Sequence, residues 1–162
     1  MTGTSTVGGG VRDVFATAQE CFLRKDLEGF AELFAEDGVH ELPFAPPGVP
    51  GYLKGRERIK QYLTSIEDAP LEIREFVDLT VHDTADPDVI LAEYTARGIV
   101  TRGKQPYEMR YVQLLRVENG RIAVWRDYWS PLDGMRALGV LGMISTVIRS
   151  RLHRAQSRRQ KR

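Results

Sequence analysis

Apolar residues recur with helical spacing in the first third of the chain. One set, at Val11, Val14, Phe15, Ala18, Cys21 and Phe22, predicts an amphipathic helix that begins at Val11. A second, shorter helix is predicted after Asp26, which can cap its N-terminus, and it ends at Asp37-Gly38. A third helix is expected from about Gly55 to Ile66, and residues 39–44 between them have the pattern of a short strand.

The rest of the domain alternates between apolar and polar residues, which is typical of strands. The four predicted strands cover about residues 71–82, 88–101, 106–117 and 121–130. They are separated by turn sequences at Thr84-Ala85-Asp86-Pro87, Gly103-Lys104 and Asn119-Gly120. Helices followed by such a meander predict an α+β fold, in which a curved antiparallel or mixed sheet wraps around the helices as a cone with an internal pocket.

The turns also predict how the strands pair. A two-residue turn at Gly103-Lys104 pairs Val100 with Tyr107 and Tyr94 with Gln113. This pairing places the tyrosines of two neighbouring strands on one face of the sheet.

The next turn decides which face carries Asp127. A two-residue Asn-Gly turn places Asp127 beside Val112, whereas a three-residue turn with a glycine bulge places it opposite Tyr111. We prefer the bulge, because the other pairing would bring Arg110 and Arg116 onto the apolar face of the sheet.

With the bulge, one face of the sheet is almost free of charge. Apart from Asp127 it carries Ala92, Tyr94, Ala96, Gly98, Val100, Tyr107, Met109, Tyr111, Gln113, Leu115, Ala123, Trp125 and Trp129. Desolvation disfavours the ionised carboxylate, so the pKa of Asp127 is expected to rise toward the range of a general acid or base. The alternative is that Asp127 lies near the rim of the sheet, where it is solvated or paired with an arginine.

The same face supplies the candidate substrate-binding residues. They are Tyr94, Tyr107, Met109, Tyr111, Gln113, Trp125 and Trp129, together with His40 from the first predicted strand. Gln113 and the tyrosine hydroxyls would hydrogen-bond a carbonyl group and stabilise enolate-like charge, and a neutral His40 would orient the substrate or relay a proton. Plain core packing of the aromatic rings and a surface or structural role for His40 are the alternatives.

Length and charge add limits to this interpretation. The 162 residues fit one domain, and no apolar stretch is long enough to span a membrane. Seven arginines and lysines and no acid lie in residues 149–162; removing them from the net charge of +1 leaves −6 for residues 1–148. We expect a disordered arm over 1–10, the domain over 11–139, and a helix that fades into a basic tail over 140–162. The acidic domain argues against nucleic-acid binding, while the tail either contacts an acidic partner weakly or only adds solubility.

Other kinds of site find little support in the sequence. Cys21 lies on the apolar stripe of the first helix and is expected to be a buried structural thiol. One cysteine excludes an internal disulfide, and no secretory signal is visible, so a cytoplasmic protein is expected. No histidine pair has metal-ligand spacing and no glycine-rich phosphate loop follows a strand, so we predict neither a metal nor a cofactor.

Several short motifs, taken in chain order, resemble those of the NTF2-like superfamily, which includes SnoaL-like polyketide cyclases and ketosteroid isomerases. They are Phe34-Ala35-Glu36-Asp37-Gly38, Gly55-Arg56-Glu57 and Val117-Glu118-Asn119-Gly120-Arg121-Ile122. The stretch from Glu118 to Leu132, with Arg136-Ala137-Leu138-Gly139, is similar to the end of the phenazine-biosynthesis A/B proteins. The resemblance covers about residues 11–138.

The resemblance implies a role for Asp127 and also limits the reaction. SnoaL-like cyclases and phenazine A/B proteins carry an acid/base carboxylate in this last strand, at the position that matches Asp127. Ketosteroid isomerases place their base at the position of Leu42 and a second acid near Gln113. Steroid isomerisation by that base is therefore not expected here.

Together these observations predict a cofactor-independent acid/base enzyme of secondary metabolism, of the lyase or isomerase class. It would act on a small carbonyl compound by cyclisation, condensation or isomerisation, with Asp127 as the proton-transfer group. The alternative is a non-catalytic module that binds a small molecule or docks a partner. A homodimer is expected through the outer sheet face, which carries Val112, Leu114, Val124 and Tyr128.

Overall fold

The computed structural model describes residues 9–135. Its helices are α1 (Val11–Leu23), α2 (Leu27–Glu32) and α3 (Arg56–Ile66), and a further helical turn begins at Pro131. Its strands are β1 (Phe34–Glu41), β2 (Tyr52–Lys54), β3 (Leu71–Asp83), β4 (Val89–Val100), β5 (Gln105–Glu118) and β6 (Arg121–Trp129). The predicted basic tail and most of the predicted N-terminal arm lie outside the described residues.

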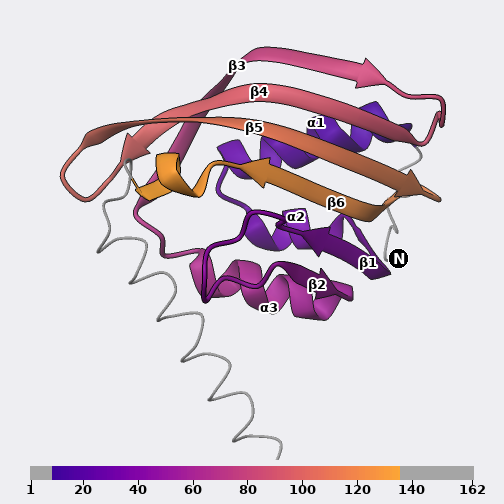
Figure 1. Cartoon of the computed structure of the whole chain (residues 1–162). Helices are drawn as coiled ribbons and strands as arrows, with labels where there is room; N and C mark the ends of the chain where they lie inside the picture. The colour runs from indigo at the N-terminus through magenta and orange to yellow at the C-terminus, as the bar shows by residue number, and fades with distance from the viewer. Residues whose placement is uncertain (1–8, 136–162) are drawn as a thin grey trace, which may run out of the picture.

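The strands form one six-stranded sheet in the order β2-β1-β6-β5-β4-β3. All neighbours are antiparallel except β1 and β6, which run parallel, so the sheet is mixed. It curves over α1 and α2, while α3 lies below β2 (Figure 1). The α+β class and the curved mixed sheet around the helices are thus confirmed.

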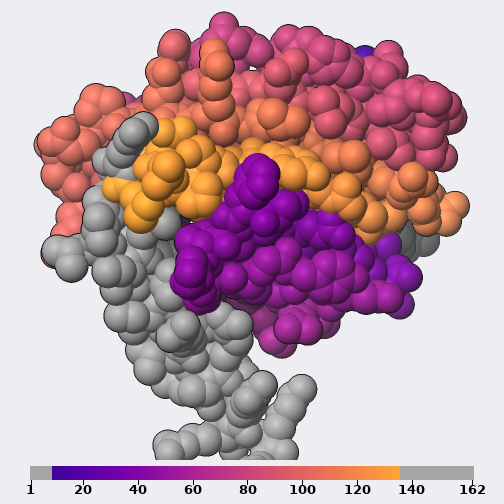
Figure 2. All heavy atoms as spheres, in the orientation of Figure 1, coloured from indigo at the N-terminus to yellow at the C-terminus, as the bar shows by residue number. Residues whose placement is uncertain are grey.

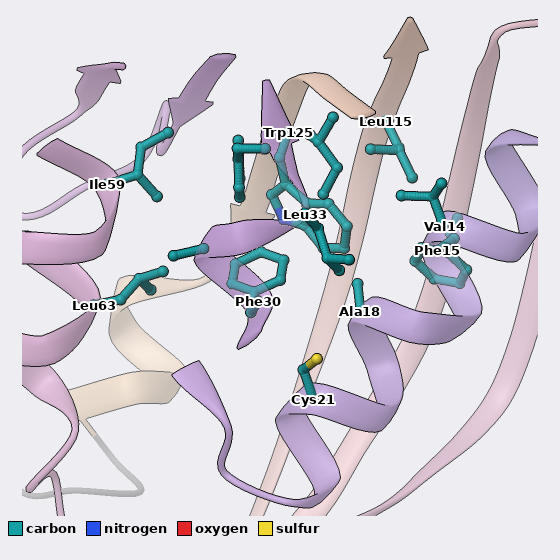
Figure 3. Packing of buried hydrophobic residues seen from close by; sticks show 14 of the residues in the cluster. Val14, Phe15, Ala18, Cys21, Phe30, Leu33, Ile59, Leu63, Leu115 and Trp125 are labelled. Carbon is teal, nitrogen blue, oxygen red and sulfur yellow. The ribbon is translucent and has the colours of Figure 1, made fainter. Parts of the chain in front are cut away.

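The core lies between the concave face of the sheet and the helices. The side chain of Phe30 on α2 is fully buried and packs edge-on against Trp125 of β6, with ring centroids 5.1 Å apart. On α1, Phe15 stacks on the other side of Trp125 at 6.1 Å, and Ala18 and Cys21 extend the same apolar stripe (Figure 3). Burial raises the pKa of the Cys21 thiol, which agrees with a structural role.

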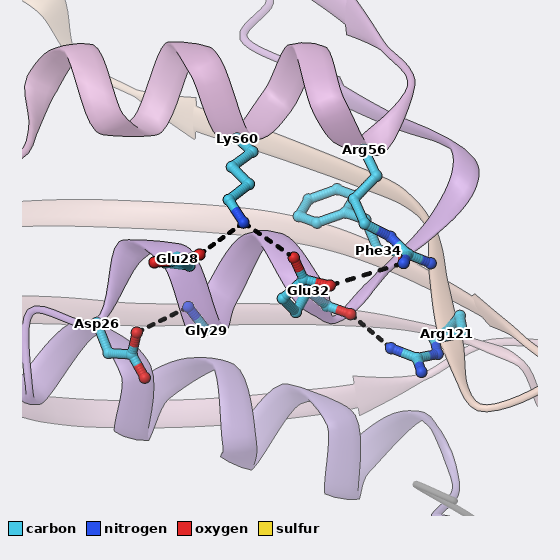
Figure 4. Close-up of polar contacts among 8 residues, drawn as sticks. All are labelled: Asp26, Glu28, Gly29, Glu32, Phe34, Arg56, Lys60 and Arg121. Carbon is cyan, nitrogen blue, oxygen red and sulfur yellow. Dashed lines mark hydrogen bonds and ion pairs between the residues drawn. The ribbon is translucent and has the colours of Figure 1, made fainter. Parts of the chain in front are cut away.

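A polar network fixes the short helix α2 against its neighbours. The Lys60 ammonium on α3 pairs with Glu28 at 2.6 Å and with Glu32 at 3.3 Å (Figure 4). Arg56 Nε donates to the carbonyl of Phe34 at 2.8 Å, and Arg121 at the start of β6 donates to the carbonyl of Glu32. These contacts hold the end of α2 where the chain turns into β1.

The chain leaves the helix earlier there than the sequence predicts. The expected second helix continues to Asp37-Gly38, but α2 ends at Glu32 and β1 begins at Phe34. A parallel partner explains the difference, since Phe34 pairs with Ile122 of β6, and pairing far along the chain overrides local helix preference. The sequence also does not predict β2, because this strand has only three residues. It forms by pairing with the end of β1.

The pairing of β4 with β5 differs by two residues from the one predicted. Tyr107 lies opposite Gly98 and Tyr94 opposite Tyr111, because the turn is a four-residue loop that starts after Val100. Gly103 and Lys104 in this loop both have positive φ angles, of 94° and 52°. A shift of two residues keeps every side chain on its predicted face.

The bulge that we prefer is present, but within the strand. Glu118 pairs with Arg121 across a two-residue turn, and the register shifts between Arg116 and Val117, where β6 contains the extra residue Ala123. Asp127 consequently lies opposite Gln113 instead of Tyr111. Asp127 thus lies on the predicted face of the sheet, but its cross-strand partner is two residues away from the predicted one.

Within residues 9–135, no helix is both long and apolar enough to cross a membrane.

Candidate functional site

The candidate site is centred on two polar side chains on the concave face of the sheet. Gln113 Nε2 on β5 donates a hydrogen bond of 3.1 Å to Asp127 Oδ1 on β6. Among residues 9–135 no other hydrogen bond reaches this carboxyl group, so Oδ2 remains available. No described arginine pairs with Asp127, so the arginine pairing that the sequence left open is not formed within residues 9–135.

Burial changes the acidity of this carboxyl group. The residue is half-buried as a whole, but the carboxyl group is packed closely within the protein. Desolvation raises the pKa of Asp127 from 3.8 to about 7, and the hydrogen bond from Gln113 offsets a part of that rise. A carboxyl group with this pKa exchanges protons readily near neutral pH.

Three tyrosines surround this pair. The hydroxyl groups of Tyr107 and Tyr111 lie 2.7 Å apart, and the ring of Tyr94 stacks on Tyr111 with centroids 5.5 Å apart. Burial raises the pKa of all three hydroxyls, so they stay protonated. The Tyr107–Tyr111 bond uses one of their two hydroxyl hydrogens, and the other can be donated to a ligand.

The remaining predicted residues of this face divide between core and edge. Trp125, which is 1% exposed, and Met109, which is 7% exposed, belong to the hydrophobic core. Trp129 is half-buried and lies opposite Tyr111, two residues beyond Asp127. Of these three side chains, only that of Trp129 is partly exposed.

His40 points inward, as predicted, one strand away from Asp127. It pairs in register with Trp125, its ring lies edge-on to that of Phe30 at 6.4 Å, and neither of its nitrogens has a hydrogen-bond partner in the described part of the chain. Burial lowers the pKa of His40 to about 4, so the imidazole is neutral at neutral pH. The strand predicted over residues 39–44 ends at Glu41, and Phe44 beyond it is exposed and contacts Tyr128.

Helix α1 contributes a polar residue that the sequence analysis missed. Gln19 lies one turn after Phe15 and one turn before Phe22, and both of these rings contact Trp125. Its Nε2 is buried and has no hydrogen-bond partner among residues 9–135. A glutamine next to an apolar stripe usually lies on the solvent side of a helix. The only signal in the sequence for the burial of Gln19 is its position between Phe15 and Phe22.

The arrangement combines a carboxyl group that titrates near pH 7 with hydroxyl and amide donors in a desolvated setting. Such a set can move a proton and stabilise a developing oxyanion. No group of three or more metal-ligating side chains occurs in residues 9–135.

Comparisons with known proteins agree with this fold. The uncharacterized protein YesE of Bacillus subtilis is 36% identical over 119 residues, which are 72% of this chain and 79% of that protein. The uncharacterized PhzA/B-like protein PA3332 of Pseudomonas aeruginosa is 36% identical over 114 residues, or 70% of this chain and 79% of that protein. The crystal structure of a provisionally assigned isomerase from Bacillus subtilis superposes with a TM-score of 0.72 at 32% identity, and it covers 80% of this chain and 92% of that one.

The SnoaL-like domain family matches residues 11–125, which extends from the first residue of α1 to the tryptophan at the centre of the core. This range contains α1 to α3, all of the sheet up to the middle of β6, and the tyrosines of the site. The chain therefore belongs to the SnoaL-like family, within the NTF2-like fold.

Proposed function

We propose that this protein is a cofactor-independent acid/base enzyme that acts on a small carbonyl compound of secondary metabolism, with Asp127 as the proton-transfer group. The observation that supports it is the pKa of about 7 at Asp127, on a face where neutral hydrogen-bond donors accompany the carboxyl group. Cyclisation, condensation and isomerisation of carbonyl compounds all begin with removal of a proton next to the carbonyl group, which such a base can perform.

Each polar group has a separate task in this proposal. Gln113 holds Asp127 through Oδ1, so that Oδ2 faces the proton to be removed. The Tyr107–Tyr111 pair donates its free hydrogen to the carbonyl oxygen as negative charge develops there. Because the pKa of both hydroxyls lies above its usual value, they donate without losing their protons.

Proton removal can be measured without knowing the natural substrate. A panel of small cyclic ketones and β-diketones is incubated with the protein in D₂O, and ¹H NMR follows the loss of the signal next to the carbonyl. Deuterium incorporation above the buffer rate is expected for at least one member of the panel. Tight binding of panel members with no exchange in any of them would contradict catalysis and favour the non-catalytic binding module.

The exchange rate is expected to depend on pH with a midpoint near 7. Only the ionised form of Asp127 accepts a proton, so the rate should fall about tenfold per pH unit below the pKa of about 7 and level off above it. The measurement is the exchange rate from pH 5 to pH 9, corrected for the buffer rate. A midpoint near 4 would show that the catalytic base is a solvated carboxylate elsewhere.

The outer face of the sheet supports a homodimer, as proposed from the sequence. Val112 is 36% exposed at the middle of β5, and Phe44 is 58% exposed while its ring contacts Tyr128 at 5.6 Å. In the space-filling view, the purple segment that follows β1 lies against the surface of β6 (Figure 2). A second copy of the chain would cover these apolar side chains.

Charge introduced on this face should therefore separate the dimer. We expect Val112→Lys to elute with the 18.3 kDa mass of one chain, and the unmodified protein with twice that mass, in size-exclusion chromatography with light scattering. Leu23→Lys is a matched control, since Leu23 is 42% exposed at the end of α1, on the other side of the sheet. An unmodified chain that elutes as a monomer would contradict the dimer.

A further inference from the structure

The amide group of Gln113 is held at one of its two ends only. Its Nε2 donates a hydrogen bond of 3.1 Å to Asp127 Oδ1. The same side chain hydrogen-bonds the Tyr94 hydroxyl, which offsets a part of the rise that burial causes in the pKa of Tyr94. Its Oε1 is buried without a partner among residues 9–135, and the side chain is 2% exposed. A buried glutamine is usually fixed by partners at both ends, whereas here the contacts with Asp127 and Tyr94 alone decide the orientation of the amide.

The strand register brings these three side chains together. Gln113 lies opposite Asp127 on β6, and Tyr94 on β4 lies opposite Tyr111, two residues before Gln113. Directly opposed and diagonal neighbours on one face of a sheet are within reach of long side chains. The ring of Tyr94 is packed edge-on against Phe76 with centroids 5.1 Å apart and stacked on Tyr111 at 5.5 Å. Its hydroxyl group is therefore kept in one place beside the Gln113 amide.

The two protonation states of Asp127 need opposite partners. An ionised carboxyl group only accepts hydrogen bonds, so it needs the N–H of Gln113, whereas a protonated one has an O–H to donate. Rotation of the amide by 180° exchanges Oε1 and Nε2, which have nearly the same size, so it needs no additional space. Oε1 then faces Asp127 and Tyr94 and can accept from both hydroxyl groups, because a carbonyl oxygen has two lone pairs. The other end of the amide has no partner in the described part of the chain and so opposes neither orientation by losing a hydrogen bond.

We propose that Gln113 is a positioning residue with two orientations: Nε2 donates to Asp127 while the carboxyl group is ionised, and the amide turns by 180° so that Oε1 accepts from Asp127 once it is protonated. In the ligand-free protein the proton comes from solvent and is added at Oδ1, and no other covalent bond changes. The inference deepens the proposed function and rests on it for the part of Gln113 in catalysis. The change of orientation itself is a property of the protein without ligand.

No charged group in the described part of the chain competes for this pair. Arg126 and Tyr128, the neighbours of Asp127 along β6, point to the opposite face of the sheet. The titratable groups on the elements packed around the pair are Tyr94 on β4, Tyr107 and Tyr111 on β5, His40 on β1 and the Cys21 thiol on α1. Burial raises the pKa of the tyrosines and of the thiol and lowers the pKa of the histidine to about 4, so all of them are neutral at neutral pH.

The orientation of the amide can be measured by NMR in the ligand-free full chain. Nuclear Overhauser contacts between the Gln113 amide hydrogens and the Asp127 β-hydrogens are recorded at pH 5.5 and pH 8.5, on either side of the pKa of about 7. The carboxyl ¹³C signal of Asp127 reports its protonation in the same samples. We expect these contacts to weaken at least about threefold at pH 5.5, because most of the carboxyl groups are then protonated and the amide hydrogens have turned away. Contacts of equal strength at both pH values, or a carboxyl group that does not titrate between them, would overturn the inference.

Three controls assign the change to this pair. Gln113→Leu identifies the Gln113 amide signals by their loss. Asp127→Asn cannot change its protonation in this range, so the contacts between Gln113 and residue 127 should have the same strength at pH 5.5 and pH 8.5. The amide of Gln105, which is exposed at the start of β5 and donates to the carbonyl of Gly103, should also keep its contacts. A pH-dependent change of orientation that persists in Asp127→Asn would overturn the inference, because Asp127 would not be its cause.

The NMR contacts and the proton-exchange assay fail independently. An amide that turns with pH in a protein that exchanges no ketone protons contradicts the proposed function and leaves the two orientations standing. Rapid exchange of ketone protons by a protein whose Gln113 amide keeps one orientation contradicts this inference alone.

Discussion

In the Asp127→Asn variant, the exchange of protons next to a carbonyl group is expected to fall by about 10²–10⁴-fold, the range that a general base contributes. The asparagine amide has the size of the carboxyl group and can still contact Gln113, but it cannot accept a proton near neutral pH. Ligand affinity should change much less than the exchange rate, because the tyrosines remain in place.

The measurement is the NMR exchange rate of the best panel compound with equal amounts of folded protein. Glu118→Gln is the control, since Glu118 is an exposed acid at the end of β5 and should keep full activity. An Asp127→Asn variant that folds normally and exchanges at the unmodified rate would exclude Asp127 as the base.

A second large effect is expected in the stability of the protein as a function of pH. Between about pH 4 and pH 7 the Asp127 carboxyl group is protonated in the folded chain and ionised in the unfolded chain. Unfolding then releases a proton, so this group lowers the free energy of unfolding as pH rises, by up to about 1.4 kcal/mol per pH unit.

His40 acts in the opposite direction over most of the same range. Its pKa is about 4 in the folded chain against 6.5 in the unfolded chain, so unfolding between these values binds a proton. This group raises the free energy of unfolding as pH rises from 4 to 6.5. The two contributions should nearly cancel there, and the destabilisation by Asp127 should continue alone up to about pH 7.

Urea titrations between pH 4.5 and pH 6.5 separate the two contributions. Relative to the unmodified protein, Asp127→Asn should gain about 2 kcal/mol of stability over this interval, whereas His40→Leu should lose about the same amount. The difference between each variant and the unmodified protein removes the contribution of the other residues. Differences that do not vary with pH would show that these groups titrate normally in the folded chain.

Local sequence signals were sufficient to place Asp127 on the correct face. The arginines of β5 excluded one pairing, and the bulge that this requires exists, although it is at Ala123 within β6 instead of in the turn. The sequence could not give the length of the β4–β5 loop, because Gly103-Lys104 fits both a two-residue turn and the end of a longer one. An error of two residues in the register leaves each side chain on its predicted face of the sheet, because side chains along a strand alternate between the two faces.

Local sequence patterns could not predict the placement of residues whose position depends on contacts with distant parts of the chain. Phe34 continues an apolar helical stripe in the sequence, yet it pairs with Ile122 on a strand at the other end of the domain. Gln19 is polar and lies beside an apolar stripe, so its burial follows only from the packing of Phe15 and Phe22 on Trp125. Such residues become visible once the sheet is assembled around the helices.

The parallel pairing of β1 with β6 also has a consequence for the order of folding. Strands β3 to β6 are joined by short turns and can pair as soon as each has been synthesised, whereas the parallel pairing of β1 must wait for β6. Closing such a distant contact is slow, because the entropy of a long loop is lost before the contact forms. During synthesis, the rings of Phe15, Phe22 and Phe30 therefore lack their contacts with Trp125 until β6 has been made, and this is the interval in which a chaperone would be expected to protect them.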